Sequence, residues 1–277
     1  MSRSNPILWL AGGSLLILAV LSYLLYLQSQ PRDQTSTDRA LKVYCAAALK
    51  SAMQAIAAEF EKETSRRVDF EFGDSGQMLG NVTVRQDGDL FLPADDSFVR
   101  LAQERGLVAE TFPLCKMHAI ILIGPGNPHH IAKLDDLLKR EIKVGIANPD
   151  KAAIGKVVRS HLSRLGRWDA LAANLIAQHI TVTDSANAVQ LGSTDAAIVW
   201  DTVAANYPDL TTVRVPELDG AIGRIELAVL ASSPDPVGAR RLARYTAASD
   251  RGSLQFRNLG FSDVESGSPW ASGGGEP

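Results

Sequence analysis

Small residues that could let an anion approach the backbone follow the first buried strand of this sequence. Val43-Tyr44-Cys45 is short, apolar and β-prone, and Ala46-Ala47-Ala48 comes directly after it. Apolar residues then recur at helical spacing as far as Phe60, which predicts a helix that begins near Ala48. The first N–H groups of a helix lack partners within it and lie at the positive end of its dipole. This join therefore predicts an anion-binding site.

The same kind of join recurs along the chain. Small or helix-capping residues also occur at Asp74-Ser75, from Asp150 to Ile154, and at Asp184-Ser185. Strands are predicted in the following ranges: 67–72, 89–92, 118–123, 142–146, 180–182, 196–200, 213–215 and 225–230. Helices are predicted between them, including 131–138, 153–165 and 184–191. Strands that alternate with helices form parallel sheets, which bind ligands beyond the carboxyl ends of the strands. We therefore expect several helix starts to face one cleft.

The sequence offers no assembly of residues that could catalyse a reaction. Asp74-Ser75-Gly76 is similar to the motif around the nucleophile of trypsin-like proteases, but Gln77 replaces the next glycine and no histidine precedes it. His129-His130 lies in a predicted turn without the cysteines or carboxylates that would complete a metal site. We expect a protein that is not an enzyme and has no cofactor.

Composition restricts the choice of partners. The net charge is −3, and hydrophobic residues make up 45% of a chain of 277 residues, so we expect a globular protein without a nucleic-acid partner. The two cysteines, Cys45 and Cys115, lack metal-site spacing. Two buried thiols are favoured over a disulfide, and both possibilities remain open at this point.

The N-terminal segment is predicted to interact with a membrane. Ile7 to Leu27 is an uncharged apolar run long enough to span a bilayer, and no typical cleavage site follows it. We interpret residues 1–27 as an uncleaved anchor, with a cleaved signal peptide as the alternative. Residues 28–40 are polar and predicted to be a linker. The rest of the chain would then lie on the periplasmic side of the cytoplasmic membrane.

From Leu41 to Phe261 the sequence resembles the molybdate-binding solute receptors of ABC importers, which are type II periplasmic binding proteins. The resemblance rests on the order of these stretches: VYCAAALKSAMQAIAAEFEKET, FGDSGQM, DGDLFLPADDSF, VGIANPDKAAIGKVVRSHLSRLGRWDAL and RGSLQFRNLGF. It implies an α/β fold of two lobes joined by two crossover strands, with an oxyanion enclosed between them. Lobe 1 would comprise residues 41–118 and 224–261, and lobe 2 residues 119–223. Residues 262–277 are predicted to be a disordered tail.

The resemblance also implies a set of ligand-binding residues. The family's first ligand position, usually a serine, falls on Ala48, and the serine of its next loop falls on Ser75. A contact at the start of the helix in lobe 2 falls on Ile154, and a backbone N–H falls on Ser185. The family's tyrosine falls on Trp200, whose indole N–H can donate a hydrogen bond but cannot accept one.

Two carboxylates complicate this expected site. Asp74 and Asp201 would repel a dianion unless their side chains turn outward or are protonated. They are also the candidate ligands of a cation in the alternative interpretation, with Glu226 as a possible third.

We expect a monomeric solute-binding protein that captures molybdate or tungstate and delivers it to an ABC permease. One alternative keeps the fold but binds a metal cation or another polar solute. Another is a membrane-anchored sensor domain.

Overall fold

The computed structural model describes residues 39–270. The predicted anchor at 1–27 and nearly all of the predicted linker lie outside these residues. Within the described part of the chain, none of the helices is both long enough and apolar enough to cross a membrane.

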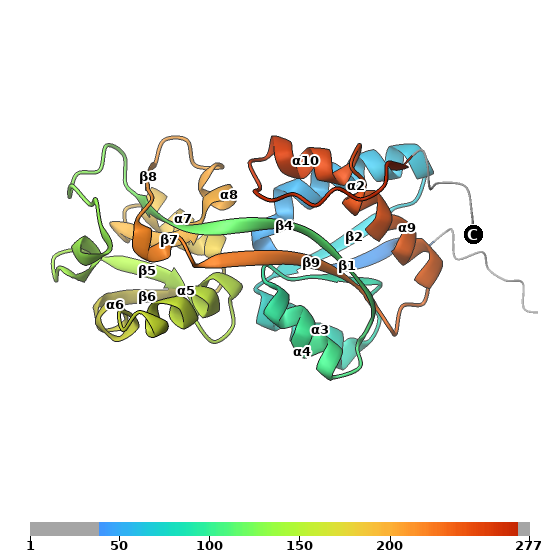
Figure 1. Cartoon of the computed structure of the whole chain (residues 1–277), viewed down its shortest axis with the longest axis horizontal. Helices are drawn as coiled ribbons and strands as arrows, with labels where there is room; N and C mark the ends of the chain where they lie inside the picture. The colour runs from blue at the N-terminus through green and yellow to red at the C-terminus, as the bar shows by residue number, and fades with distance from the viewer. Residues whose placement is uncertain (1–38, 271–277) are drawn as a thin grey trace, which may run out of the picture. The chain divides into compact units, whose positions relative to one another are not determined.

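The first lobe contains a mixed sheet with helices on both faces. Its strands occur in the order β2-β1-β3-β9-β4, with β2 and β3 parallel to β1 and with β9 antiparallel to β3 and β4. The strand bounds are β1 Leu41–Ala46, β2 Val68–Gly73, β3 Leu90–Leu92, β4 Val108–Ile123 and β9 Ile222–Leu230. The helix bounds are α2 Lys50–Thr64, α3 Ser75–Arg85, α4 Asp96–Glu104, α9 Pro236–Ala247 and α10 Gly252–Asn258. Helices α2, α9 and α10 cover one face and α3 and α4 the other (Figure 1).

The second lobe is built on the far end of β4. Its strands occur in the order β4-β7-β5-β6, β5 is parallel to both its neighbours, and β8 pairs with β4. The strand bounds are β5 Val144–Ala147, β6 Leu175–His179, β7 Ala196–Trp200 and β8 Thr211–Val213. The helix bounds are α5 Ala153–Arg164, α6 Trp168–Asn174, α7 Val182–Gln190 and α8 Asp201–Ala204. Short 3-10 helices of this lobe are η3 Leu134–Leu138 and η4 Pro216–Leu218, whereas η2 Ala47–Leu49 lies between β1 and α2 in lobe 1.

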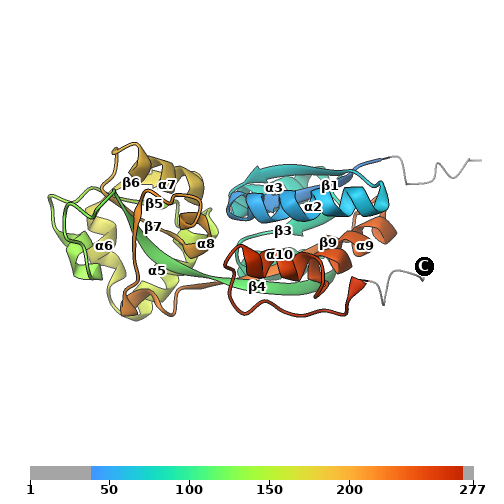
Figure 2. The same cartoon turned by 90° about the horizontal axis from the view of Figure 1, so that it is seen from above.

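Two long strands connect the lobes. β4 and β9 pair in antiparallel register from Val108 opposite Leu230 to His118 opposite Ile222, and β4 then continues into the sheet of lobe 2. Figures 1 and 2 show both strands running side by side between the lobes. The predicted α/β fold of two lobes with two crossover strands is therefore confirmed.

The apolar pattern of the sequence explains the core of lobe 1. β1 is almost wholly buried between the two helical layers, and Met53, Ile56 and Phe60 form the buried face of α2. The ring of Phe60 packs edge to face against Tyr245 of α9, with 5.2 Å between their centroids. Both cysteines are free and buried, and burial raises the pKa of each thiol. The first strand and helix are thus anchored on one continuous core.

Residues 262–270 differ from the predicted disordered tail. Trp270 packs edge to face on Tyr245 at 5.0 Å between centroids, and its backbone N–H donates to the Asp250 carboxylate at 2.7 Å. The Glu265 N–H donates to the Leu114 carbonyl at 2.8 Å. A large aromatic side chain and these backbone hydrogen bonds hold this segment on lobe 1, although it contains three serines and no regular apolar pattern.

Three other local expectations are corrected by the structure. The predicted helix at 131–138 is a 3-10 helix confined to Leu134–Leu138. The strand predicted at 118–123 is only the last part of β4. The prediction begins too late because Pro113 and several polar residues interrupt the apolar pattern of the first part of the strand. The strand predicted at 180–182 ends earlier, at His179, and this shift changes which residues begin α7.

Candidate functional site

A small cavity lies between the two lobes, at the carboxyl ends of several strands. The volume open to the centre of a water molecule is about 20 Å³. We call it the inner cavity, and its lining residues are Ala46, Ala47, Ala48, Gly73, Asp74, Ser75, Ala94, Ala152, Ala153, Ile154, Thr181, Val182 and Trp200. Most of these residues are buried, and both lobes contribute to the lining. The structure therefore brings together Ala48, Ser75, Ile154 and Trp200 from the predicted set.

Lobe 1 presents the start of a helix that has no side-chain cap. β1 ends at Ala46, which occupies the N-cap position of η2 and cannot accept a hydrogen bond with its methyl side chain. Helix α2 continues directly from η2. The backbone N–H groups of Ala47 and Ala48 thus occupy the first positions of a helical segment whose start lines the inner cavity.

Lobe 2 presents a second helix start of the same kind. Ala152 is the N-cap of α5, and it also provides no side-chain acceptor. Ala153 and Ile154 begin the helix, and both are almost completely buried. A Cβ atom at Gly155 would collide with the carbonyl oxygen of Ala147, so glycine allows this helix start to pack closely on the end of β5. A buried helix start without a cap leaves amide donors for a ligand.

The start of α7 differs, because a capping box closes it. The Thr181 hydroxyl accepts from the Asp184 N–H at 3.1 Å, and the Asp184 carboxylate accepts from the Thr181 N–H at 2.9 Å. Val182, the first residue of α7, lines the inner cavity and remains available through its backbone N–H.

The structure does not place Ser185 in the lining of the inner cavity. It lies one helical turn further along α7, its N–H donates to the Thr181 carbonyl, and its hydroxyl lies 3.1 Å from Nδ1 of His179. The predicted strand ends at 182 instead of His179, and the predicted helix begins at 184 instead of Val182. The Thr181-to-Asp184 spacing, which is typical of a capping box, is the signal that could have identified Val182 instead.

Ser75 provides the hydroxyl of the inner cavity. It is 1% exposed, and its Oγ accepts a hydrogen bond from the Ala94 N–H at 3.1 Å. Among the described residues the hydroxyl finds no acceptor of its own, so its proton can be donated to a ligand. The preceding residue, Asp74, caps α3 by accepting from the Gln77 N–H at 2.7 Å.

Trp200 forms the wall of the inner cavity nearest the crossover strands. It is fully buried at the end of β7, where it pairs with Ala119 of β4. A Cβ atom at Gly223 of β9 would lie 2.9 Å from the Trp200 ring, so the glycine leaves room for the indole. The side chain therefore packs against the hinge and also borders the cavity.

The lining residues carry no lysine, arginine or histidine side chain. Positive potential must then come from helix dipoles and backbone N–H groups. Donors of this kind suit an anion that is bound by hydrogen bonds without a counter-cation.

The structure turns Asp201 away from this cavity. Its carboxylate accepts from the N–H groups of His118 and Thr202 at 3.1 and 3.0 Å, and it pairs with Arg214 at 3.1 Å. Asp74 and Asp201 do not form a joint cation site, and no group of three or more histidine, cysteine or acidic side chains suited to a metal occurs among residues 39–270.

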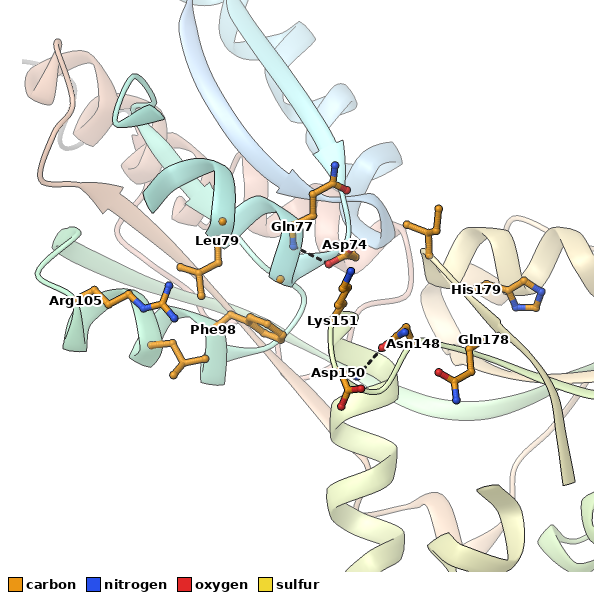
Figure 3. A pocket seen from close by; sticks show the side chains of 14 residues that line it. Asp74, Gln77, Leu79, Phe98, Arg105, Asn148, Asp150, Lys151, Gln178 and His179 are labelled. Atoms are coloured by element: carbon orange, nitrogen blue, oxygen red, sulfur yellow. Dashed lines mark hydrogen bonds between the residues drawn. The ribbon is translucent and has the colours of Figure 1, made fainter. Parts of the chain in front are cut away.

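A larger pocket, which we call the outer pocket, lies next to the inner cavity and shares Asp74 with it. Its volume is about 700 Å³, and it is lined from lobe 1 by α3 and α4 and from lobe 2 by the β5–α5 loop and β6. Figure 3 shows Phe98 and Arg105 on one side of this outer pocket and Asn148, Gln178 and His179 on the other. The Gly76 N–H donates to the Lys151 carbonyl at 2.9 Å, which joins the lobes directly beside it.

Comparison with known proteins identifies the family. A model described as bacterial extracellular solute-binding protein matches residues 41–262. This chain belongs to that family. The resemblance inferred from the sequence is confirmed, and this family membership identifies a binding protein, not an enzyme with a cofactor.

Individual relatives carry more specific names. The molybdate-binding protein ModA of Mycobacterium tuberculosis is 29% identical over 229 residues, covering 80% of this chain and 85% of the relative. The periplasmic molybdate-binding protein of Azotobacter vinelandii has a similar structure, with a TM-score of 0.70 and 17% identity, covering 80% of this chain and 98% of the other. The sulfate-binding protein SubI of Mycobacterium tuberculosis also has a TM-score of 0.70, with 16% identity and coverage of 80% and 86%. At such identities the two structures establish the fold alone.

Proposed function

We propose that this protein is a solute receptor that closes its two lobes on a tetrahedral oxyanion, with molybdate or tungstate as the preferred ligand. It would deliver the anion to an ABC permease as a monomer. The apolar run from Ile7 to Leu27 would tether it to the periplasmic side of the cytoplasmic membrane.

One observation carries the proposal: two helix starts without side-chain caps, on opposite lobes, line the same cavity. Backbone N–H groups at Ala48, Ile154 and Val182 and the Ser75 hydroxyl would surround the anion, and Trp200 would close the cavity beside them.

The choice of anion follows from the donors and from the relatives. Backbone amides and a hydroxyl that already accepts a hydrogen bond offer donors, which suits an anion that carries no proton at neutral pH. Molybdate and tungstate fit this description, and curated relatives are named for molybdate. Sulfate fits as well, so cavity size must separate these anions.

Thermal unfolding of the full chain in detergent micelles tests the proposal. Molybdate, tungstate, sulfate and phosphate are each added at increasing concentration, with Ca²⁺, Mn²⁺ and Fe³⁺ as comparison ligands. An anion at about 100 times its Kd should stabilise the protein by about 2.7 kcal/mol. A shift with cations alone, or with none of these ligands, would contradict the proposed function.

A further inference from the structure

A lysine of lobe 2 lies over an aromatic ring of lobe 1. The Nζ atom of Lys156, in α5, is 4.6 Å from the centroid of the Phe98 ring, in α4. This distance is within the range of a cation–π interaction. Because α4 belongs to lobe 1 and α5 to lobe 2, this contact and the Gly76–Lys151 hydrogen bond both cross the cleft.

The surroundings make this contact strong for its type. Phe98 is only 4% exposed and Lys156 is half-buried, so water screens the ammonium group less than at an open surface. Among residues 39–270, no carboxylate lies within ion-pair distance of Lys156. The nearby Asp150 is paired with Arg159 at 2.6 Å. The ring of Phe98 is therefore the partner of the Lys156 charge.

The contact is also linked mechanically to the inner cavity. The Lys156 N–H donates to the carbonyl of Ala152 at 3.0 Å, which places Lys156 one turn beyond the uncapped start of α5. A helical turn is rigid, so a ligand that draws Ala153 and Ile154 toward lobe 1 also carries Lys156 toward Phe98. An opening of the cleft would separate the Lys156 ammonium group from the Phe98 ring, which is packed in the core of lobe 1.

We propose that Lys156 and Phe98 form an interlobe clasp that sets how long the receptor retains its anion. The inference rests on the proposed function, because the clasp acts on the closed form that holds the ligand. The clasp contributes nothing to an open form, so it slows dissociation and leaves the stability of the separate lobes unchanged. Lys156 and Phe98 are thus positioning residues that do not touch the anion.

The test uses the full chain and two substitutions of the lysine. Lys156→Met keeps most of the side-chain stem and removes the charge, whereas Lys156→Arg keeps a cation that can lie over the ring. We expect Lys156→Met to increase the molybdate dissociation rate about three- to tenfold, with the association rate unchanged. Lys156→Arg should restore slow dissociation. Phe98→Leu should also speed dissociation, with an added loss of folding stability because Phe98 belongs to the core of lobe 1. The double variant should release molybdate no faster than Phe98→Leu alone.

Two results in the kinetic experiment would overturn the clasp. One is a Lys156→Met dissociation rate within about twofold of the wild-type rate. The other is a loss confined to the association rate, which would indicate long-range steering of the anion by the lysine charge. The thermal stability of Lys156→Met gives a further criterion. If it falls as much without ligand as with molybdate, the contact supports folding rather than closure, and the clasp is contradicted.

A second measurement does not depend on the identity of the ligand. Spin labels on Lys62→Cys in lobe 1 and Arg140→Cys in lobe 2 report the interlobe distance, and the buried Cys45 and Cys115 should remain unlabelled. Lys156→Met should reduce the short-distance population. Distance distributions that are identical to those of the parent chain, with and without molybdate, would overturn the clasp. If no anion binds the wild-type chain, the proposed function fails, while this comparison still decides on the clasp.

Discussion

The Ser75 hydroxyl oxygen accepts a hydrogen bond of 3.1 Å from the Ala94 N–H. Because the oxygen already accepts a hydrogen bond, the hydroxyl is oriented as a donor before any ligand arrives. Such pre-orientation lowers the cost of binding an anion.

Ser75→Ala should therefore weaken anion binding. A hydrogen bond to a charged group contributes about 1.5–3 kcal/mol, so the Kd for molybdate should rise by about tenfold or more. Ser185→Ala is the matched control, since this equally buried serine of lobe 2 does not line the inner cavity. Isothermal titration calorimetry distinguishes them, and equal losses in both variants would contradict the assignment of Ser75.

Asp74→Asn should tighten the binding of a dianion. Asp74 lines the inner cavity and the pocket beside it, where its negative charge would oppose that of the ligand. Asparagine can still accept from the Gln77 N–H and cap α3, so the fold should be retained. We expect the molybdate Kd to fall about tenfold. Asp96→Asn, which removes a carboxylate paired with Arg100 outside both pockets, should leave the Kd unchanged. Weaker binding in Asp74→Asn would show that the carboxylate assists the ligand.

Gly155→Ala should destabilise lobe 2 and displace the start of α5. The new methyl group would collide with the Ala147 carbonyl, which is held in β5. A loss of about 2 kcal/mol in the free energy of unfolding is typical of such overpacking. Gly80→Ala is a suitable comparison, because it lies within α3 and a Cβ atom there meets open space. That substitution should stabilise the protein by about 0.5–1 kcal/mol in chemical denaturation. A neutral Gly155→Ala would mean that the β5–α5 junction can relax.

The stability of the protein should fall as the pH is lowered through the titration range of histidine. Burial lowers the pKa of His179 below its ordinary value of 6.5, with a smaller opposing effect from Asp184. As the pH falls, His179 is therefore protonated more readily in the unfolded chain than in the folded chain. The contribution of neutral His179 to the free energy of unfolding is present above about pH 6.5 and is lost as the pH falls toward the pKa of His179 in the folded chain.

His179→Gln should flatten this part of the pH profile, measured as the thermal midpoint between about pH 7.5 and pH 5.5. His130→Asn is the control, because His130 lies exposed in a turn with a φ of 51° that asparagine tolerates. A profile unchanged by His179→Gln would assign the pH dependence to other groups.

The sequence predicts the two-lobed fold because its apolar periods are strong and the turns between them are marked by small and capping residues. Ala48, Ser75 and Ile154 could be placed near one another from this pattern, since parallel strands bring their carboxyl ends to one edge. Periodicity does not determine which turn of a helix comes first. The resemblance places a backbone contact at Ser185, whereas α7 begins at Val182, and the Thr181-to-Asp184 capping box is the sequence signal that marks this start.

Long-range pairing is the part that the sequence could not supply. The outer half of β4 contains Glu110, Pro113 and Lys116, and it forms a strand because β9 pairs with it. Trp270 likewise holds residues 262–270 on lobe 1 through contacts with Tyr245 and Asp250. Both partners lie 20 or more residues earlier in the chain, outside the low-complexity segment that contains Trp270. In both cases a distant partner decides the local structure.

The Ala119 N–H donates to the Ala221 carbonyl at 3.0 Å, at the point where one strand enters lobe 2 and the other returns from it. The whole of lobe 2 is thus inserted between two neighbouring positions of a β-ladder. A short turn across those positions could replace it and convert β4 and β9 into an ordinary hairpin. The shortened chain would retain Ala48 and Ser75 of lobe 1 but none of the amides of α5 and α7, so it would hold only one side of the inner cavity.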